Sequence, residues 1–261
     1  MFGDNNKNSA QYGGAVSVRA GSAVFDASQF KNNEAENGGA LYLSGTADIS
    51  SGTFDSNKAD NGGAIYVDEE ASVNITGSVT IENNEAENGG AIYLADDTNA
   101  QLNIAGSSYL TFQGNYASLN GGAIYASQAS SMNFSQTVNF EGNYTENGNG
   151  GIFTCGNLEN SIIEANTLQH NYGTSNWMAG IVLCSVELED EYHPDTTFDE
   201  NLHFPNNTKS LDEMLTAPHN VVVYGNSVSN NNSSGVYCDG SYLCFIVNND
   251  IYSNDKEGMC L

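Results

Sequence analysis

A seven-residue segment that recurs in the first half of the chain limits the possible folds more than any other feature. Each copy joins two glycines to an alternating apolar and aromatic run. The copies read NGGALYL at 37–43, NGGAIYV at 61–67, NGGAIYL at 88–94 and NGGAIYA at 120–126, with a weaker GGAVSV at 13–18. Two glycines permit a tight turn, and the residues after them alternate between the two faces of a strand. Repetition at a nearly constant period predicts a stacked solenoid.

A second motif, an apolar residue followed at the third position by asparagine, precedes each glycine pair. Its copies are Phe2–Asn5, Phe30–Asn33, Phe54–Asn57, Ile81–Asn84, Phe112–Asn115 and Phe140–Asn143. These asparagines are 28, 24, 27, 31 and 28 residues apart, which is about the length of one coil of a three-sided parallel β-helix. We therefore predict an all-β fold, a right-handed single-stranded parallel β-helix of about nine coils of 23–31 residues, with an irregular excursion near 185–220.

The alternation within each strand predicts which side chains point inward. In GGAIYV we expect Ile65 and Val67 to fill the coil, with Ala64 and Tyr66 on the other face. Further strands are predicted at 47–49, 73–75, 102–104 and 132–134. If the aliphatic face is inside, the equivalent tyrosines form an outward column, and that column is the candidate binding surface. Its members are Tyr42, Tyr66, Tyr93 and Tyr125. The opposite alternation would place these tyrosines in the core.

The asparagine of the second motif is interpreted as a turn residue. Its side chain is expected to bond to backbone groups of its own and adjacent coils, forming a structural ladder. The predicted ladder consists of Asn33, Asn57, Asn84, Asn115 and Asn143. The other interpretation, a ligand-binding or catalytic asparagine, has no supporting motif.

The second half of the chain keeps a related rhythm, so we predict one domain over 1–261. Residues 1–155 carry the repeats and 156–261 form more general β-helix coils, interrupted by the excursion at 185–220. Within it, Phe198–Asn201 is a candidate degenerate coil, because Asn201 lies 30 residues from both Asn171 and Asn231. The segment 210–215, SLDEML, is a candidate helical turn. Because motifs stand at both ends of the sequence, we expect a fragment of a longer protein.

The charge balance excludes several partners. Six Lys and Arg residues against 32 Asp and Glu give a net charge of −26, which repels nucleic acid and anionic membranes. No apolar run reaches 18 residues, so no membrane insertion by this segment is expected. An acidic surface favours cations. No cofactor is predicted except possible calcium, with Asp68, Glu69, Asp96 and Asp97 as the candidate ligands. A solvated acidic corner and a catalytic carboxylate pair are the alternatives.

Five cysteines lie in the second half, and four of them follow a Gly-apolar corner. They are Cys155, Cys184, Cys238, Cys244 and Cys260. A stacked cysteine column inside the coil is expected, and a disulfide between Cys155 and Cys184 is the alternative. No C-x-x-C spacing occurs, which disfavours zinc.

The two motifs together resemble the repeats of chlamydial polymorphic membrane proteins. The matching segments are 38–41, 62–65, 89–92 and 121–124, with Phe30/Asn33, Phe54/Asn57, Phe112/Asn115 and Phe140/Asn143, whereas Ile81 replaces phenylalanine. The resemblance covers about residues 2–155. It implies a non-enzymatic adhesin or structural passenger of the autotransporter kind, extracellular or on the cell surface and outer-membrane-associated if bacterial. The implied partner is a host-cell or matrix protein or a glycan.

A carbohydrate-active enzyme is the rival interpretation, because pectate lyases and polygalacturonases are also right-handed β-helices. Such an enzyme needs clustered carboxylates and, for a lyase, a basic residue in a groove. Arg19 is the only arginine, and the strong negative charge opposes an acidic polysaccharide. We therefore expect no enzymatic activity, with a polysaccharide lyase or glycoside hydrolase as the alternative.

Overall fold

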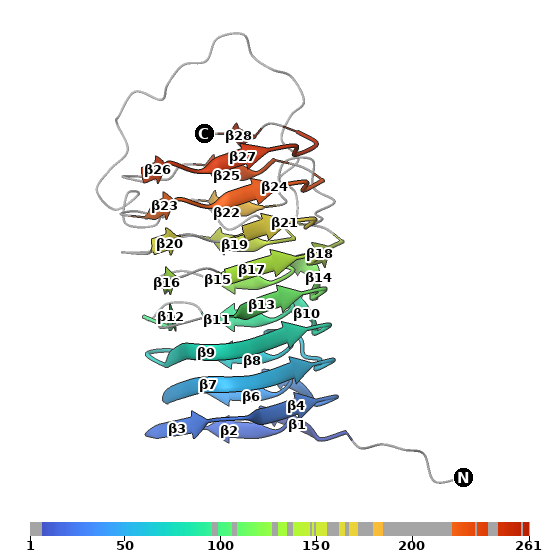
Figure 1. The fold of residues 1–261 in the computed structure, drawn as a ribbon. Helices are drawn as coiled ribbons and strands as arrows, with labels where there is room; N and C mark the ends of the chain where they lie inside the picture. Colours follow the sequence, from blue (N-terminus) through green and yellow to red (C-terminus); the bar gives the residue numbers. More distant parts are fainter. Residues whose placement is uncertain are drawn as a thin grey trace, which may run out of the picture.

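The computed structural model describes residues 7–95, 99–105, 109–126, 130–134, 138–146, 148, 150–155, 162–164, 167–171, 180–184, 221–232, 234–239, 245–256 and 258–260. Over these residues the chain forms a stack of parallel strands without a helix (Figure 1). The levels follow one another from the N-terminal end to the C-terminal end. The predicted all-β parallel β-helix is confirmed.

One side of the stack is a nine-stranded sheet, to which each level contributes one short strand. Ile65 lies in register between Leu41 of the level before and Ile92 of the level after. The strands are β2 (Val16–Val18), β6 (Leu41–Leu43), β8 (Ile65–Val67), β11 (Ile92–Leu94), β15 (Ile124–Ala126), β19 (Ile152–Cys155), β22 (Ile181–Cys184), β25 (Val236–Asp239) and β28 (Met259–Cys260).

The second side is a fourteen-stranded sheet, in which most levels contribute two consecutive strands. In two levels a single long strand covers both positions. The strands are β3 (Ser22–Phe25), β4 (Ser28–Lys31), β7 (Thr46–Asp55), β9 (Ser72–Glu82), β12 (Gln101–Ile104), β13 (Leu110–Gln113), β16 (Ser131–Phe134), β17 (Val138–Glu141), β20 (Ile162–Glu164), β21 (Thr167–Gln169), β23 (Val222–Tyr224), β24 (Ser227–Ser229), β26 (Phe245–Val247) and β27 (Asp250–Tyr252). The strands predicted at 47–49, 73–75, 102–104 and 132–134 all lie in this sheet.

The third side is the shortest, and it corrects the predicted number of coils. Its strands are β1 (Ser9–Tyr12), β5 (Glu34–Asn37), β10 (Glu85–Asn88), β14 (Tyr116–Asn120) and β18 (Tyr144–Thr145), and isolated bridges at Lys58 and Asn61 connect β5 to β10. Six described levels therefore carry all three sides, so the regular solenoid has about six turns. The nine predicted coils correspond only to the nine strands of the first sheet.

The core is a continuous apolar column inside the coil. Ile65 and Val67 are fully buried, whereas Tyr66 between them is only partly buried. Phe54, Ile81 and Phe112 stack in register and are fully buried as well, so the isoleucine that replaces phenylalanine keeps its core position. This arrangement is the period-two alternation with the aliphatic face inward.

The two glycines of each repeat have different roles. The first of each pair has positive φ, with values of 67° at Gly38, 63° at Gly62, 61° at Gly89 and 65° at Gly121. The second has ordinary φ but lies against the next level. A Cβ on Gly63 would come closer than 3.0 Å to the carbonyl oxygen of Gly90 and to the backbone of Glu85. The expectation of positive φ therefore holds for the first glycine, while close stacking requires the second.

The strands that precede and follow residues 185–220 are neighbours in the stack. β22 pairs directly with β25, and β21 pairs directly with β24. The candidate degenerate coil at Phe198–Asn201 lies outside the described residues. The predicted helical turn at 210–215 lies outside the described residues as well.

The cysteines do not form the single column that was predicted. The backbone register sets Cys155 opposite Cys184, but it sets Cys238 opposite Leu183 and Cys260 opposite Tyr237. The reason is spacing: cysteine is the fourth residue after glycine in GIFTC and GIVLC, but the third in GVYC and the second in GMC. A shift of one residue moves a side chain to the other face of a strand. Cys244 lies outside the described residues.

Candidate functional site

The predicted asparagines form a buried ladder that uses the full hydrogen-bonding capacity of each amide. Asn84 Oδ1 accepts from the backbone N–H and from Nδ2 of Asn57, at 3.0 and 2.9 Å. Asn84 Nδ2 donates to Asn115 Oδ1 at 2.9 Å and to the Phe54 carbonyl at 3.0 Å. The Asn84 side chain is fully buried, so these four bonds replace water completely. This set of contacts gives the asparagines a structural role.

The ladder extends beyond the five predicted members at both ends. Asn8 Nδ2 donates to Asn33 Oδ1 at 2.8 Å, although Asn8 stands outside the motif copies. Beyond Asn143, the ladder continues through Asn171, Asn231 and Asn254. The bond between Asn171 and Asn231 joins residues 60 apart in sequence, which shows that these two asparagines occupy adjacent levels.

A row of left-handed residues immediately precedes the ladder, and the sequence interpretation missed it. A positive φ turns the chain sharply, so that the next side chain enters the coil. The residues, with φ between 53° and 63°, are Asn32, Ser56, Asn83, Gly114, Gly142, His170, Asn230 and Ser253. The signal was present in the sequence, because five of the eight are asparagine or glycine, the residues that adopt this conformation most easily.

The four predicted tyrosines form a stacked column on the nine-stranded sheet. The ring centroids of Tyr42 and Tyr66 are 5.4 Å apart, those of Tyr66 and Tyr93 5.2 Å, and those of Tyr93 and Tyr125 5.0 Å. Interplanar angles of 11°, 9° and 5° show that the rings are nearly parallel. All four side chains are partly buried. We call these four residues the tyrosine ladder.

Tyr12 extends the aromatic column at its N-terminal end. The residue in register with Tyr42 in the preceding level is Ser17, which has no ring. Tyr12 comes instead from β1 on the neighbouring side, with its ring centroid 4.9 Å from that of Tyr42. The Arg19 guanidinium lies 5.2 Å from the centre of the Tyr12 ring. The sequence motif does not include Tyr12, because it precedes the glycine pair rather than following it.

The described structure includes two of the four predicted calcium ligands, Asp68 and Glu69. Asp68 accepts a hydrogen bond from the Tyr42 hydroxyl, while Glu69 lies exposed in the turn that follows. Asp96 and Asp97 lie outside the described residues. Among the residues that are described, no three His, Cys, Asp or Glu side chains form a group that could hold a metal. The Asp68 carboxylate therefore contacts the tyrosine ladder, through Tyr42.

Two tyrosines, Tyr42 and Tyr116, lie beside carboxylates that affect their ionisation. Burial, followed by the hydrogen bond and negative charge of Asp68, raises the pKa of Tyr42 above its usual value. Burial, followed by the hydrogen bond to Glu146, raises the pKa of Tyr116 to about 12. Both effects favour the neutral phenol, because ionisation would place a second negative charge beside a carboxylate.

These shifts predict how the protein responds to alkaline pH. An unfolded tyrosine ionises near pH 10, whereas Tyr116 in the folded chain ionises at about 12. The stability that Tyr116 contributes is therefore complete below about pH 10 and is lost as pH rises towards 12. Phenolate absorbance should show a late component from Tyr42 and Tyr116, and Tyr116→Phe should remove one tyrosine's share of it. Tyr109→Phe, at a position 77% exposed, serves as the control and should retain the whole late component. Joint ionisation of all 14 tyrosines near pH 10 would contradict the prediction.

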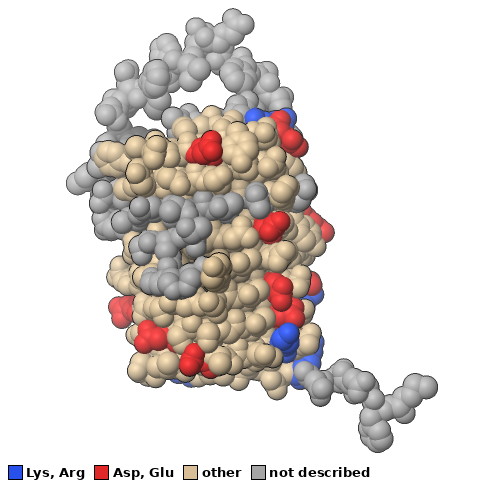
Figure 2. Space-filling model, viewed as in Figure 1, with Lys and Arg blue, Asp and Glu red and all other residues tan. Residues whose placement is uncertain are grey.

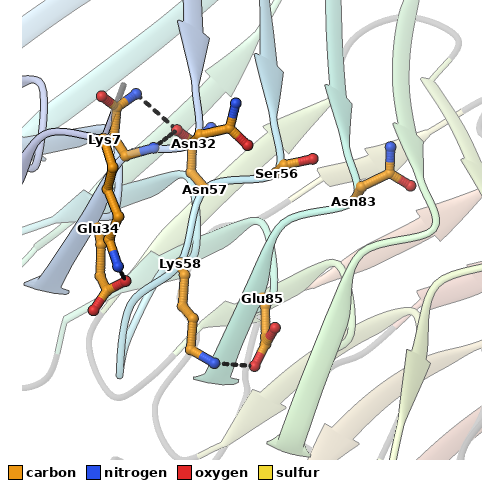
Figure 3. Close-up of a pocket in the computed structure, with 9 residues that line it drawn as sticks. Lys7, Asn32, Glu34, Ser56, Asn57, Lys58, Asn83 and Glu85 are labelled. Atoms are coloured by element: carbon orange, nitrogen blue, oxygen red, sulfur yellow. Dashed lines mark hydrogen bonds and ion pairs between the residues drawn. The ribbon is translucent and has the colours of Figure 1, made fainter. Parts of the chain in front are cut away.

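A polar groove follows the corner between the fourteen-stranded sheet and the third side. Figure 3 shows Asn32, Ser56 and Asn83 in a row above two ion pairs, Lys7 with Glu34 and Lys58 with Glu85. The groove has a volume of about 270 Å³. Its lining, which we call the corner groove, consists of Lys7, Asn32, Asn33, Glu34, Ser56, Asn57, Lys58, Asn83 and Glu85.

The corner groove differs in charge from the rest of the acidic surface. Figure 2 shows acidic side chains scattered over many levels of the stack, with basic side chains in only a few places. Asp55 lies beside the groove and accepts hydrogen bonds from Ser56 Oγ at 2.8 Å and from Asn83 Nδ2 at 3.4 Å. Burial raises the pKa of Asp55, but these two bonds and Lys31 outweigh burial, so its pKa lies below the usual value. Asp55 is therefore a fixed anion that orients two residues of the groove.

Two family models match the chain. The model described as periplasmic copper-binding protein (NosD) matches residues 101–261, which is more than half of the sequence. The model described as Chlamydia polymorphic membrane protein repeat matches residues 51–68 and 78–95, so the resemblance stated from the repeats is confirmed. No curated protein and no solved structure matches.

Copper, which the first of these descriptions names, does not fit the described side chains. Copper is bound by imidazole and by thiolate or thioether sulfur. His170 is the one histidine within the described ranges, and it is exposed in a turn of positive φ. These ranges also lack any metal-binding group of three or more His, Cys, Asp or Glu. The described residues therefore do not form a copper site. In the same ranges, no helix has the length and hydropathy that crossing a bilayer requires.

Proposed function

This chain belongs to the family described as periplasmic copper-binding protein (NosD), and we propose that it acts in the cell envelope or at the surface as a non-enzymatic adhesin. Both matched descriptions refer to the periplasm or to a membrane, which supports an envelope or surface location. The proposed binding surface is the tyrosine ladder, and the proposed partner is a host-cell or matrix protein.

The ladder supports this function because it is rigid before any partner arrives. Each inner ring stacks between two others, so its orientation is fixed without the loss of side-chain freedom that binding usually requires. Tyrosine supplies large contact area and a polar hydroxyl, which is why it is common in protein interfaces. All four rings lie on consecutive strands of the nine-stranded sheet, and Asp68 accepts a hydrogen bond from the Tyr42 hydroxyl.

The stacking also indicates which kind of partner fits. The two faces of Tyr66 and of Tyr93 are covered by neighbouring rings, so these rings can offer a partner their edges but not their faces. Sugars typically stack on the open face of an aromatic ring. The ladder is therefore better suited to a protein surface, which can pack against ring edges, than to a saccharide.

The test is binding of the chain to cultured cells and to a panel of immobilised matrix proteins. The double variant Tyr66→Thr/Tyr93→Thr keeps residues that favour strands and removes two inner rings. We expect binding to weaken on the order of a hundredfold, because central aromatic residues usually dominate an interface.

A matched control removes two tyrosines outside the ladder. Tyr224 and Tyr252 are 40% and 48% exposed and lie on the fourteen-stranded sheet. Tyr224→Thr/Tyr252→Thr should bind like the unmodified chain. Equal binding by both double variants would argue against the ladder as the binding surface. Release of reducing or unsaturated oligosaccharides from polysaccharides would instead support the alternative, a polysaccharide lyase or glycoside hydrolase.

A further inference from the structure

We propose that the corner groove binds a neutral oligosaccharide that lies along the axis of the solenoid. This site would give the proposed adhesin a second class of ligand at a second surface. Its biological role rests on the proposed adhesin function. The geometry that supports it is separate from the tyrosine ladder, because the groove lies at another corner of the coil.

The groove repeats along the axis at the spacing of the coils. Its rims take one residue from each of three consecutive levels: Asn32, Ser56 and Asn83 on one rim, and Glu34, Lys58 and Glu85 on the other. Neighbouring parallel strands are about 4.7–4.9 Å apart. A sugar ring in an extended oligosaccharide advances by a similar distance, so successive rings would meet equivalent groups of the protein.

The two rims present both donors and acceptors. The first rim carries two amides and a hydroxyl, and the second alternates carboxylate, ammonium and carboxylate (Figure 3). A sugar hydroxyl donates one hydrogen bond and accepts others, and it therefore matches a surface on which both kinds of partner alternate. Exposed side-chain fractions of 43% and 39% for the pair Lys7–Glu34, and of 56% and 48% for Lys58–Glu85, show that these groups are accessible.

The charge balance favours a neutral ligand. Lys7 and Lys58 are paired with Glu34 and Glu85, so the charged groups of the groove sum to zero in a chain of net charge −26. A polyanion would be repelled by the surrounding surface, and a strongly cationic ligand would meet the two lysines. A neutral oligosaccharide is repelled neither by the acidic surface nor by the two lysines.

The groove is also preorganised. Its floor contains Asn33 and Asn57, which are buried and held in the ladder by bonds of 2.8–3.1 Å. Ser56 and Asn83 are oriented by Asp55 and by their left-handed backbone. Few side chains of the groove therefore have to become ordered when a ligand binds. This lowers the entropic cost of binding, so that a ligand that makes only weak contacts can still be bound.

The experiment uses the 261-residue chain with cellotriose, maltotriose, chitotriose and mannotriose as neutral probes and trigalacturonate as an acidic one. Binding is measured by saturation-transfer NMR and calorimetry. We expect at least one neutral trisaccharide to bind with an affinity that does not change with salt. Lys58→Met/Glu85→Met removes the exposed ion pair while keeping apolar stems, and should weaken binding on the order of tenfold. Lys256→Met, which removes an exposed cation that is not part of the groove lining, should not weaken it.

The outcomes separate this assignment from the adhesin function. Saccharide binding that the double variant weakens and Tyr66→Thr/Tyr93→Thr leaves unchanged supports the groove. Absence of neutral saccharide binding, binding unaffected by the double variant, or preference for trigalacturonate overturns it. Loss of saccharide binding alone, with cell or matrix binding intact, would leave the adhesin proposal standing. Saccharide binding without any cell or matrix binding would overturn the adhesin and leave the groove.

Discussion

Replacing Asn84 with alanine is expected to lower the free energy of unfolding by about 4 kcal/mol, the largest effect of any polar substitution that we predict. The variant removes one hydrogen-bond partner from each of four buried groups: the backbone N–H and the Nδ2 of Asn57, the Phe54 carbonyl and Asn115 Oδ1. Asn57 Nδ2 keeps its bond to the Phe30 carbonyl, and Asn115 Oδ1 keeps its bond from the backbone N–H of residue 84. Each unsatisfied buried group costs roughly 1–3 kcal/mol, and partial relaxation reduces the sum. Chemical denaturation followed by circular dichroism measures the change.

Asn103→Ala is the matched control for this prediction. Asn103 also belongs to a ladder, with Nδ2 donating to Asn74 Oδ1 at 3.1 Å and Oδ1 accepting from Asn133 Nδ2 at 3.1 Å. Its ladder is only partly buried, so water replaces the lost bonds and the expected cost is under about 1 kcal/mol. If both variants lost the same stability, burial would not be the reason for the effect.

Asn84→Asp tests the donor side of the same contact. A carboxylate still accepts from Asn57, but it cannot donate to the Phe54 carbonyl or to Asn115 Oδ1. Burial and these two facing oxygens should raise the carboxyl pKa in the folded chain. Stability should therefore be highest below the unfolded value of about 3.9 and should fall as pH rises through the folded pKa. A variant whose stability does not change with pH would contradict this interpretation.

Gly63→Ala is expected to destabilise the solenoid by about 3 kcal/mol or more, and it gives the second large effect. A single methyl group at this position meets the Gly90 carbonyl and the Glu85 backbone at distances under 3.0 Å. These contacts are with the backbone of the next level, so a rotamer change cannot relieve them. The levels must separate locally, which weakens hydrogen bonds such as the one from Gly63 N to Gly89 O at 3.1 Å.

Gly142→Ala separates steric crowding from backbone conformation. Gly142 has a φ of 63°, but a Cβ there would find nothing within 4 Å. Its expected cost is the left-handed conformation alone, about 1–2 kcal/mol. Thermal and denaturant unfolding of the two variants should therefore differ clearly. Equal losses would show that the close stacking at Gly63 is relieved by small shifts.

The repeats allowed the sequence to predict the parts of the fold that one coil specifies by itself. Alternation in IYV placed Ile65 and Val67 inside and Tyr66 outside, because a strand turns successive side chains to opposite faces. The motif Phe-x-x-Asn indicated a core phenylalanine and a buried turn asparagine for the same reason. Equal spacing then indicated that equivalent residues stack, as the tyrosine ladder does.

Properties that depend on contacts between levels could not be predicted in this way. The role of the second glycine follows from the position of the next coil. The cysteine columns depend on a difference of one residue in corner length, and the direct bond from Asn171 to Asn231 depends on which levels touch. The corner groove combines a turn residue with charged residues of the third side, which no single motif contains.

The chain alone therefore specified the local conformation and the orientation of each strand, because both depend on the order of residues over a few positions. The tertiary structure decided which levels are adjacent, why the second glycine has no side chain, and where Lys7, Lys58 and the turn residues come together. These features arise only when separate coils are stacked about 5 Å apart, since groups some 25 residues apart in sequence then become neighbours.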